Sequence, residues 1–186
     1  MTQPGEASPR STALFAVVGE VEGHVAEAGW DQPPQLFALV DTEQLLKAEP
    51  QLAESLGLMA AVPGSLTPVA QEELADEPLD EALARIQFGT EVLGVVLVHE
   101  VLILPPAAEA ALDEADPVGG AAAHPDRRDV RMVVAVVRDG TRECLLRVRG
   151  ADGQSDELLS GPDLAPALAD ALLATLDEAP SAPARR

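Results

Sequence analysis

A tryptophan turn that ends in two prolines separates the first helix predicted for this chain from the first strand. Residues 29–34 read Gly-Trp-Asp-Gln-Pro-Pro, and Trp30 is the only tryptophan. Proline lacks an amide hydrogen and biases the preceding residue toward extended backbone, so a helix cannot continue through Pro33 and Pro34. The turn indicates organisation rather than chemistry, because no spacing in the sequence assembles a recognisable catalytic or metal site.

Apolar side chains place a helix before this turn and a strand after it. The three acids Glu20, Glu22 and Glu27 fall between the apolar positions and are expected on the solvent side. Residues 36–40 form a short apolar run typical of a strand. The helical stripe, with steps of three and four residues, consists of Leu14, Val17, Val18, Val21, Val25 and Ala28.

Three shorter elements follow the first strand. Asp41 or Thr42 is predicted to cap a short helix, since both side chains accept hydrogen bonds from a first helical turn. Residues 66–69 read as an extended segment, which Pro68 restricts to a sheet edge or a strand start. Pro78 is predicted to open another helix.

The clearest strand signals lie in the second half of the chain. Residues 92–104 are rich in β-branched side chains and predict a central strand that is covered on both faces. Residues 130–149 contain two alternating runs around Asp139-Gly140, a dipeptide typical of a two-residue hairpin turn. With that turn, Val133 would oppose Leu146, Ala135 would oppose Cys144, and Val137 would oppose Arg142.

The element order predicts one α+β domain over residues 11–178, with a largely antiparallel sheet, a C-terminal β-hairpin and packing by N- and C-terminal helices. The C-terminal helix is expected to begin at the Ser160 cap. Residues 1–10 and 179–186 are polar and contain proline, and both are expected to be disordered. Residues 105–128 lack a clear period and are interpreted as a long, mobile, acidic loop.

The charge balance narrows the classes of partner. A formal net charge of −20 disfavours nucleic acid and anionic membranes as partners, because both would be repelled. The single cysteine, Cys144, excludes an internal disulfide, and it is expected to be a buried, unreactive thiol with a raised pKa. No signal peptide or membrane-length apolar run is evident, so we expect a cytoplasmic protein without a metal or cofactor.

Basic side chains are concentrated in one segment. Seven of the eleven arginines lie in residues 127–149, against three acids there. They are interpreted either as internally neutralised, by acids such as those in residues 72–81, or as a patch that binds an acidic protein, phosphate or carboxylate. The candidate binding residues are Trp30, Asp31, Arg127, Arg128, Arg138, Arg147 and Arg149.

We therefore expect a non-enzymatic protein-interaction or regulatory module with an unidentified protein partner. One alternative is a small hydrolase or ligand-binding enzyme that uses His124, Asp126 and Arg128, although the same residues also suit an ordinary turn before a strand. No nucleophile can be named beside them. A second alternative is a structural homodimer formed through an open sheet edge.

Several segments together resemble a known protein family. Residues 29–40 read GWDQPP, then Gln35, then LFALV, and residues 83–86, 104–106 and 124–128 add further matching phrases. This set is similar to an uncharacterised family of small acidic cytoplasmic proteins from high-GC Gram-positive bacteria. The resemblance covers most of the predicted domain, and it implies no particular activity, cofactor or catalytic residue.

Overall fold

The computed structural model describes residues 8–71, 74, 78–110, 112, 116–150 and 155–177. These residues form a single α+β domain around a six-stranded antiparallel sheet, with the strand order β2-β1-β3-β4-β5-β6. The strands are β1 (Gln35–Asp41), β2 (Leu66–Ala70), β3 (Gly94–Ile103), β4 (Arg128–Val137), β5 (Arg142–Val148) and β6 (Glu157–Ser160). The helices are α1 (Pro9–Glu27), α2 (Thr42–Ala48), α3 (Pro50–Ser55), α4 (Leu79–Arg85), α5 (Pro106–Glu109), α6 (Pro117–Ala123) and α7 (Pro166–Ala174).

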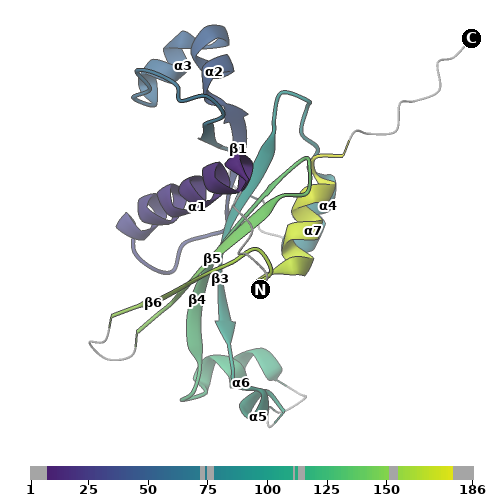
Figure 1. Ribbon diagram of the computed structural model, residues 1–186. Coiled ribbons are helices and arrows are strands. Elements are labelled where there is room, and N and C mark those ends of the chain that lie inside the picture. Colours follow the sequence, from purple (N-terminus) through teal and green to yellow (C-terminus); the bar gives the residue numbers. More distant parts are fainter. Residues whose placement is uncertain are drawn as a thin grey trace, which may run out of the picture.

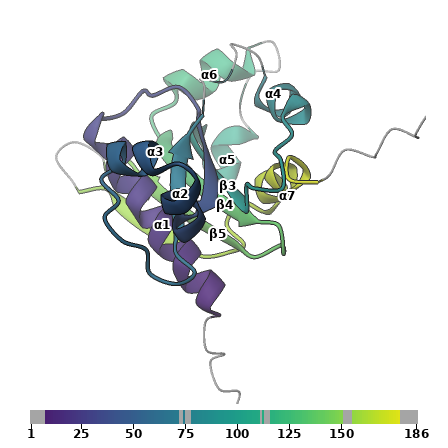
Figure 2. The same cartoon turned by 90° about the horizontal axis from the view of Figure 1, so that it is seen from above.

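Helices cover both faces of the sheet. Helix α1 crosses one face, whereas α4 and α7 lie together against the other (Figures 1 and 2). Side chains alternate along each strand, so Val133 and Ala135 face α1 while Val134 and Val136 face α7. This arrangement gives two apolar layers and confirms the predicted fold class.

The first helix confirms the predicted apolar stripe from Leu14 to Val25, whereas Ala28 is exposed and lies just after the helix. The Ser8 hydroxyl caps α1 by accepting a hydrogen bond from the amide of Ser11, and the helix ends before the tryptophan turn. Glu22 was expected to face solvent beside Glu20, but only 4% of its surface is exposed. That expectation was wrong because β5 places an arginine beneath the helix at this position.

Helices α2 and α3 form a small lobe that projects from one end of the sheet (Figure 1). Asp41 caps α2, as predicted, with its Oδ1 2.9 Å from the amide nitrogen of Gln44. The hydroxyls of Thr42 and Thr67 form a buried hydrogen bond of 2.9 Å that ties the lobe to β2. Strand β2 lies at the sheet edge, as Pro68 required.

The β4–β5 hairpin exists, but its predicted register was wrong by one residue. Val134 lies opposite Cys144, Met132 opposite Leu146, and Val136 opposite Arg142. The turn contains three residues, 138–140, and the amide of Val137 bonds to the carbonyl of Thr141 at 3.0 Å. Gly140 takes the left-handed conformation, with φ of +84°, that such a turn needs at its last position.

The C-terminal region differs from expectation in two places. Ser160 lies in the edge strand β6 rather than capping a helix, and α7 begins only at Pro166. Within residues 105–128, interpreted as a loop, the structure contains the short helices α5 and α6. Pro9 and Arg10, which the predicted disordered N-terminus included, belong to α1. Residues 1–7, the expected tail at 179–186 and several positions in 105–128 lie outside the described residues.

Candidate functional site

A buried ionic cluster lies beneath the C-terminal half of α1. Arg131 on β4 is only 1% exposed, and its guanidinium donates to Glu100 Oε1 on β3 from Nε at 3.0 Å and from Nη2 at 2.7 Å. The two residues are direct cross-strand partners, which places them on the same sheet face. Glu22 of α1 lies 3.8 Å from Arg131 Nη1. The charges are buried together, so each one offsets the cost of desolvating another.

Arg147 extends this cluster across β5. It lies opposite Arg131 in the hairpin and donates to both carboxylate oxygens of Glu22, at 2.7 Å from Nη2 to Oε2. Its Nη1 also contacts Asp156 Oδ2 at 3.4 Å. The hydrogen bonds with Glu22 are the main cause of a raised pKa for Arg147. Glu22 therefore lies beside two arginines that would otherwise repel each other.

The tryptophan turn is joined to the same cluster. Arg131 lies over the Trp30 ring with its guanidinium carbon 4.7 Å from the ring centroid, and Arg149 approaches the ring at 5.4 Å. Arg131 also donates to the carbonyl of Gly29, and Glu100 Oε2 accepts from the amide of Asp31 at 2.7 Å. Asp31 has a positive φ of 67°, a conformation that this hydrogen bond helps to hold.

Three of the other candidate arginines also contact the protein itself, whereas Arg128 is exposed. Arg138 donates to backbone carbonyls of Val92 at 2.8 Å and Gly89 at 2.6 Å, and to that of Leu176, so it joins the hairpin turn to two distant segments. Arg127 donates to the carbonyl of Ala122. Arg149 contacts Asp129 at 3.5 Å, but 44% of its side chain is exposed. None of these partners lies in the described part of the acidic run at 72–81, of which residues 72–73 and 75–77 lie outside the described residues.

The residues of the enzyme hypothesis do not share a described pocket. Asp126 and Arg128 line a small depression beside Ile103, whereas His124 is not part of its lining. His124 accepts a hydrogen bond at Nδ1 from the amide of Asp126, at 3.1 Å, and so takes part in a local turn.

Cys144 and His99 lie on the sheet face that packs against α7, where Cys144 is buried and His99 is half-buried. Cys144 is 1% exposed, and burial raises the pKa of its thiol to about 11, so the expected unreactive cysteine is confirmed. His99 points to the opposite sheet face from Glu100, as alternation predicted, and burial lowers its pKa.

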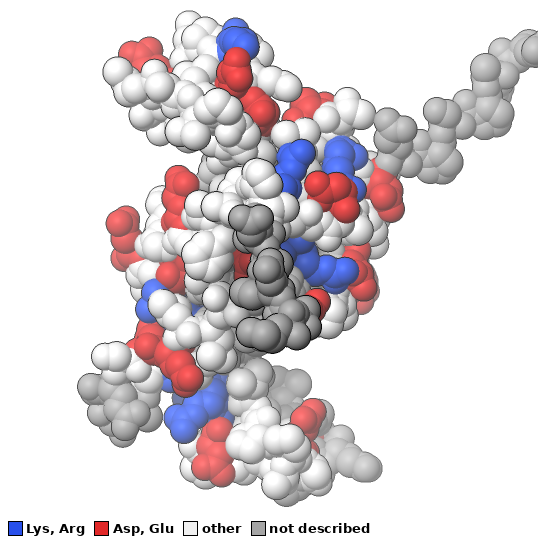
Figure 3. Space-filling view, in the orientation of Figure 1, with Lys and Arg blue, Asp and Glu red and all other residues white. Residues whose placement is uncertain are grey.

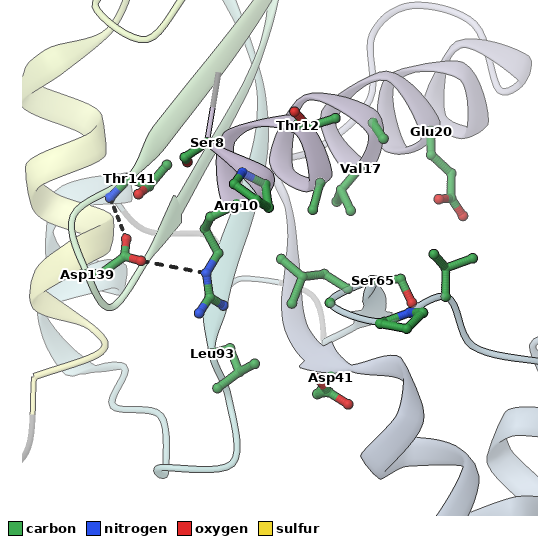
Figure 4. A pocket seen from close by; sticks show the side chains of 17 residues that line it. Ser8, Arg10, Thr12, Val17, Glu20, Asp41, Ser65, Leu93, Asp139 and Thr141 are labelled. Carbon is green, nitrogen blue, oxygen red and sulfur yellow. Dashed lines mark hydrogen bonds and ion pairs between the residues drawn. The ribbon is translucent and has the colours of Figure 1, made fainter. Parts of the chain in front are cut away.

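A groove of about 840 Å³ opens at the other end of α1 (Figure 4). Its walls are the first half of α1, the loop at 62–65 before β2, and the tip of the β4–β5 hairpin. Sequence reasoning missed it, because its parts are separated by up to about 130 positions along the chain. The lining residues with apolar side chains are Pro9, Ala13, Ala16, Val17, Val62, Pro63, Leu66 and Leu93.

The polar side chains of this groove carry more negative than positive charge. Glu20, Asp41 and Asp139 line it, and Arg10 is the only cation in the lining. Arg10 Nε lies 3.6 Å from Asp139 Oδ2, as Figure 4 shows. Two hydrogen bonds from Thr141 are the main cause of a lowered pKa for Asp139, and Arg10 contributes less.

Acidic side chains predominate on the face seen in Figure 3, and the basic side chains visible there lie beside acidic ones. Among the described residues, no group of three or more His, Cys, Asp or Glu side chains is placed to hold a metal ion. No helix within the same part of the chain is both long and apolar enough to cross a membrane.

Comparison with known proteins places the chain in one family. No curated protein and no solved structure matched it. The model of one family, described as PPA1309-like protein, matches residues 14–177, which include α1 from Leu14 onward, the whole sheet and α7. The chain therefore belongs to the uncharacterised family of PPA1309-like proteins.

Proposed function

We propose that this protein is a non-enzymatic protein-interaction module that acts in the cytoplasm. The observation that carries the proposal is the groove beside α1, which has an apolar floor, a charged rim and about 840 Å³ of space. Its volume lies within the range of known ligand-binding pockets.

The internal contacts of the arginines support the choice of the groove over the hairpin. Arg131 and Arg147 already pair with buried carboxylates, and Arg138 donates to backbone carbonyls. A partner that used these guanidiniums would have to break those hydrogen bonds first. The groove offers surface that no described segment of the chain fills.

The test is affinity capture from native cytosol with three forms of the protein. Ala16→Arg places a long cation in the groove at an exposed helical position. His24→Arg adds the same charge to the same helix outside the groove. We expect a stoichiometric partner with the wild type and with His24→Arg, and its loss with Ala16→Arg.

Circular dichroism of each variant shows whether the fold is retained. Recovery of no partner by any form would contradict the proposed function. A partner that Ala16→Arg retains would show that the module binds through another surface, such as the exposed side of Arg149.

A further inference from the structure

We infer that the groove beside α1 receives a basic peptide segment of another protein, anchored by an apolar side chain. The inference rests on the proposed function and names the chemistry of the partner. Three observations carry it, namely the shape of the floor, the unequal charges of the rim and the exposed apolar wall.

Small side chains make the floor deep enough for an anchor. Ala13 and Ala16 lie in the first half of α1 and leave space above Val17, while Leu66 and Leu93 close the sheet side. These apolar side chains favour an aliphatic side chain over a polar one, although the lining also includes the Ser65 hydroxyl, which is buried and has no hydrogen-bond partner among the described residues. The wall opposite α1 includes Val62, which is 72% exposed and would become buried against such a segment.

The rim favours cations on either side of that anchor. Arg10 is paired with Asp139, which leaves the carboxylates of Glu20 and Asp41 without an ion pair among the described residues. Asp41 accepts the amide of Gln44 through one oxygen, and its charge remains near the groove. A lysine or arginine of a bound segment would reach these carboxylates at the solvent boundary.

The charge of the whole chain acts in the same direction. A net charge of −20 attracts a cationic segment from a distance and repels acidic ones. Complementary charge of this kind raises association rates and selects among partners more than it adds affinity. The apolar anchor is therefore expected to supply most of the affinity, and the rim most of the discrimination.

A library of short random peptides displayed on phage tests the inference directly. Selection uses the full chain, with counter-selection against Ala16→Arg. We expect enriched sequences to carry lysine or arginine around one aliphatic residue. The enriched peptide is then synthesised with a fluorescent label, and its affinity is measured by anisotropy.

Two double variants with equal loss of charge separate specific pairing from general attraction. Glu20→Gln with Asp41→Asn removes both rim carboxylates, and asparagine keeps the cap of α2. Glu27→Gln with Glu54→Gln removes two exposed acids outside the groove. We expect the first pair to weaken binding by about tenfold and the second by less than about twofold.

Three results would overturn the inference. The first is an equal loss of peptide affinity in the two double variants. The second is enrichment of peptides that are acidic or lack an apolar residue. The third is that no enriched peptide loses binding to Ala16→Arg. If capture from cytosol still yields a partner that Ala16→Arg loses, the proposed function stands and only the chemistry assigned to the partner is wrong.

Discussion

Two faces of helix α1 hold charged side chains in opposite circumstances. On the face turned toward the sheet, Glu22 is buried and lies against Arg131 and Arg147, with every charge matched inside the protein. On the face turned away from the sheet, Glu20 stands at the rim of an open groove without an ion-pair partner among the described residues. Two glutamates separated by one residue thus have different tasks, because helical rotation sends one to the sheet and the other to solvent.

Charges that are buried against partners hold the fold together, whereas exposed charges without partners are available to a ligand. A buried ionic cluster specifies how α1, the tryptophan turn and the sheet fit together, although its net contribution to stability need not be large. Removal of one member is costly even so, because its partner is left buried and unpaired. Exposed rim carboxylates carry no such penalty, so they can serve binding.

The largest expected effect separates the two glutamates. Glu22→Ala should lower the free energy of unfolding by about 3 kcal/mol or more, since it leaves Arg131 and Arg147 facing each other. Glu20→Ala on the same helix should change it by less than about 0.5 kcal/mol. Urea unfolding followed by circular dichroism measures both free energies. Similar losses in the two variants would contradict the distinction between the buried and the exposed glutamate.

A smaller effect is expected at Trp30. Trp30→Leu removes the ring that Arg131 and Arg149 approach, and it should lower the free energy of unfolding by about 2 kcal/mol. Trp30→Phe keeps an aromatic face and should lower it by less. Thermal unfolding followed by circular dichroism suits both variants, because each lacks the only tryptophan. Equal losses would show that the ring contributes by its bulk alone.

Salt should weaken peptide binding at the groove by about tenfold and leave the buried ionic cluster nearly unaffected. Raising NaCl from about 0.05 M to about 0.5 M shortens the range of electrostatic attraction at exposed sites but acts little on buried pairs. We expect the enriched peptide to bind about tenfold more weakly, while the stability difference between wild type and Glu22→Ala stays nearly constant. Anisotropy and urea unfolding at both salt concentrations measure the two quantities.

The smallest expected effect concerns the ion pair at the groove. The pKa of Asp139 is lowered from 3.8 in the folded protein, mainly by Thr141. Its stabilisation is therefore present above the ordinary carboxyl pKa and lost as pH falls through the lowered value. Because the side chain is about half exposed, Asp139→Asn should cost less than about 0.5 kcal/mol at pH 7, and this cost should shrink as pH falls below the ordinary carboxyl pKa. A difference that grows in acid would contradict this sign.

Sequence patterns predicted the elements better than their pairing. Proline, caps and apolar periods located α1, α2, α4 and the long strands, because those signals are local. The hairpin register was not readable, since residues 133–137 of β4 are apolar on both faces and a one-residue shift leaves the pattern unchanged. Strand β6 was missed because it has only four residues, all exposed.

The candidate sites were less readable because they depend on distant contacts. An arginine-rich hairpin looks the same in sequence whether its charges face solvent or a buried glutamate. Only the strand order, which places β3 beside β4, brings Glu100 to Arg131. The groove likewise forms only where the 62–65 loop and the hairpin tip meet α1, and no single segment of the sequence predicts that contact.

Hydrogen exchange of the full chain, with and without the enriched peptide, tests the central claim most directly. We predict that the peptide slows amide exchange in residues 8–20 and 62–66 and leaves residues 29–34 and 142–149 unchanged. Slowed exchange in residues 29–34 and 142–149, with none in residues 8–20 and 62–66, would show that the arginine cluster is the binding surface and would contradict the account.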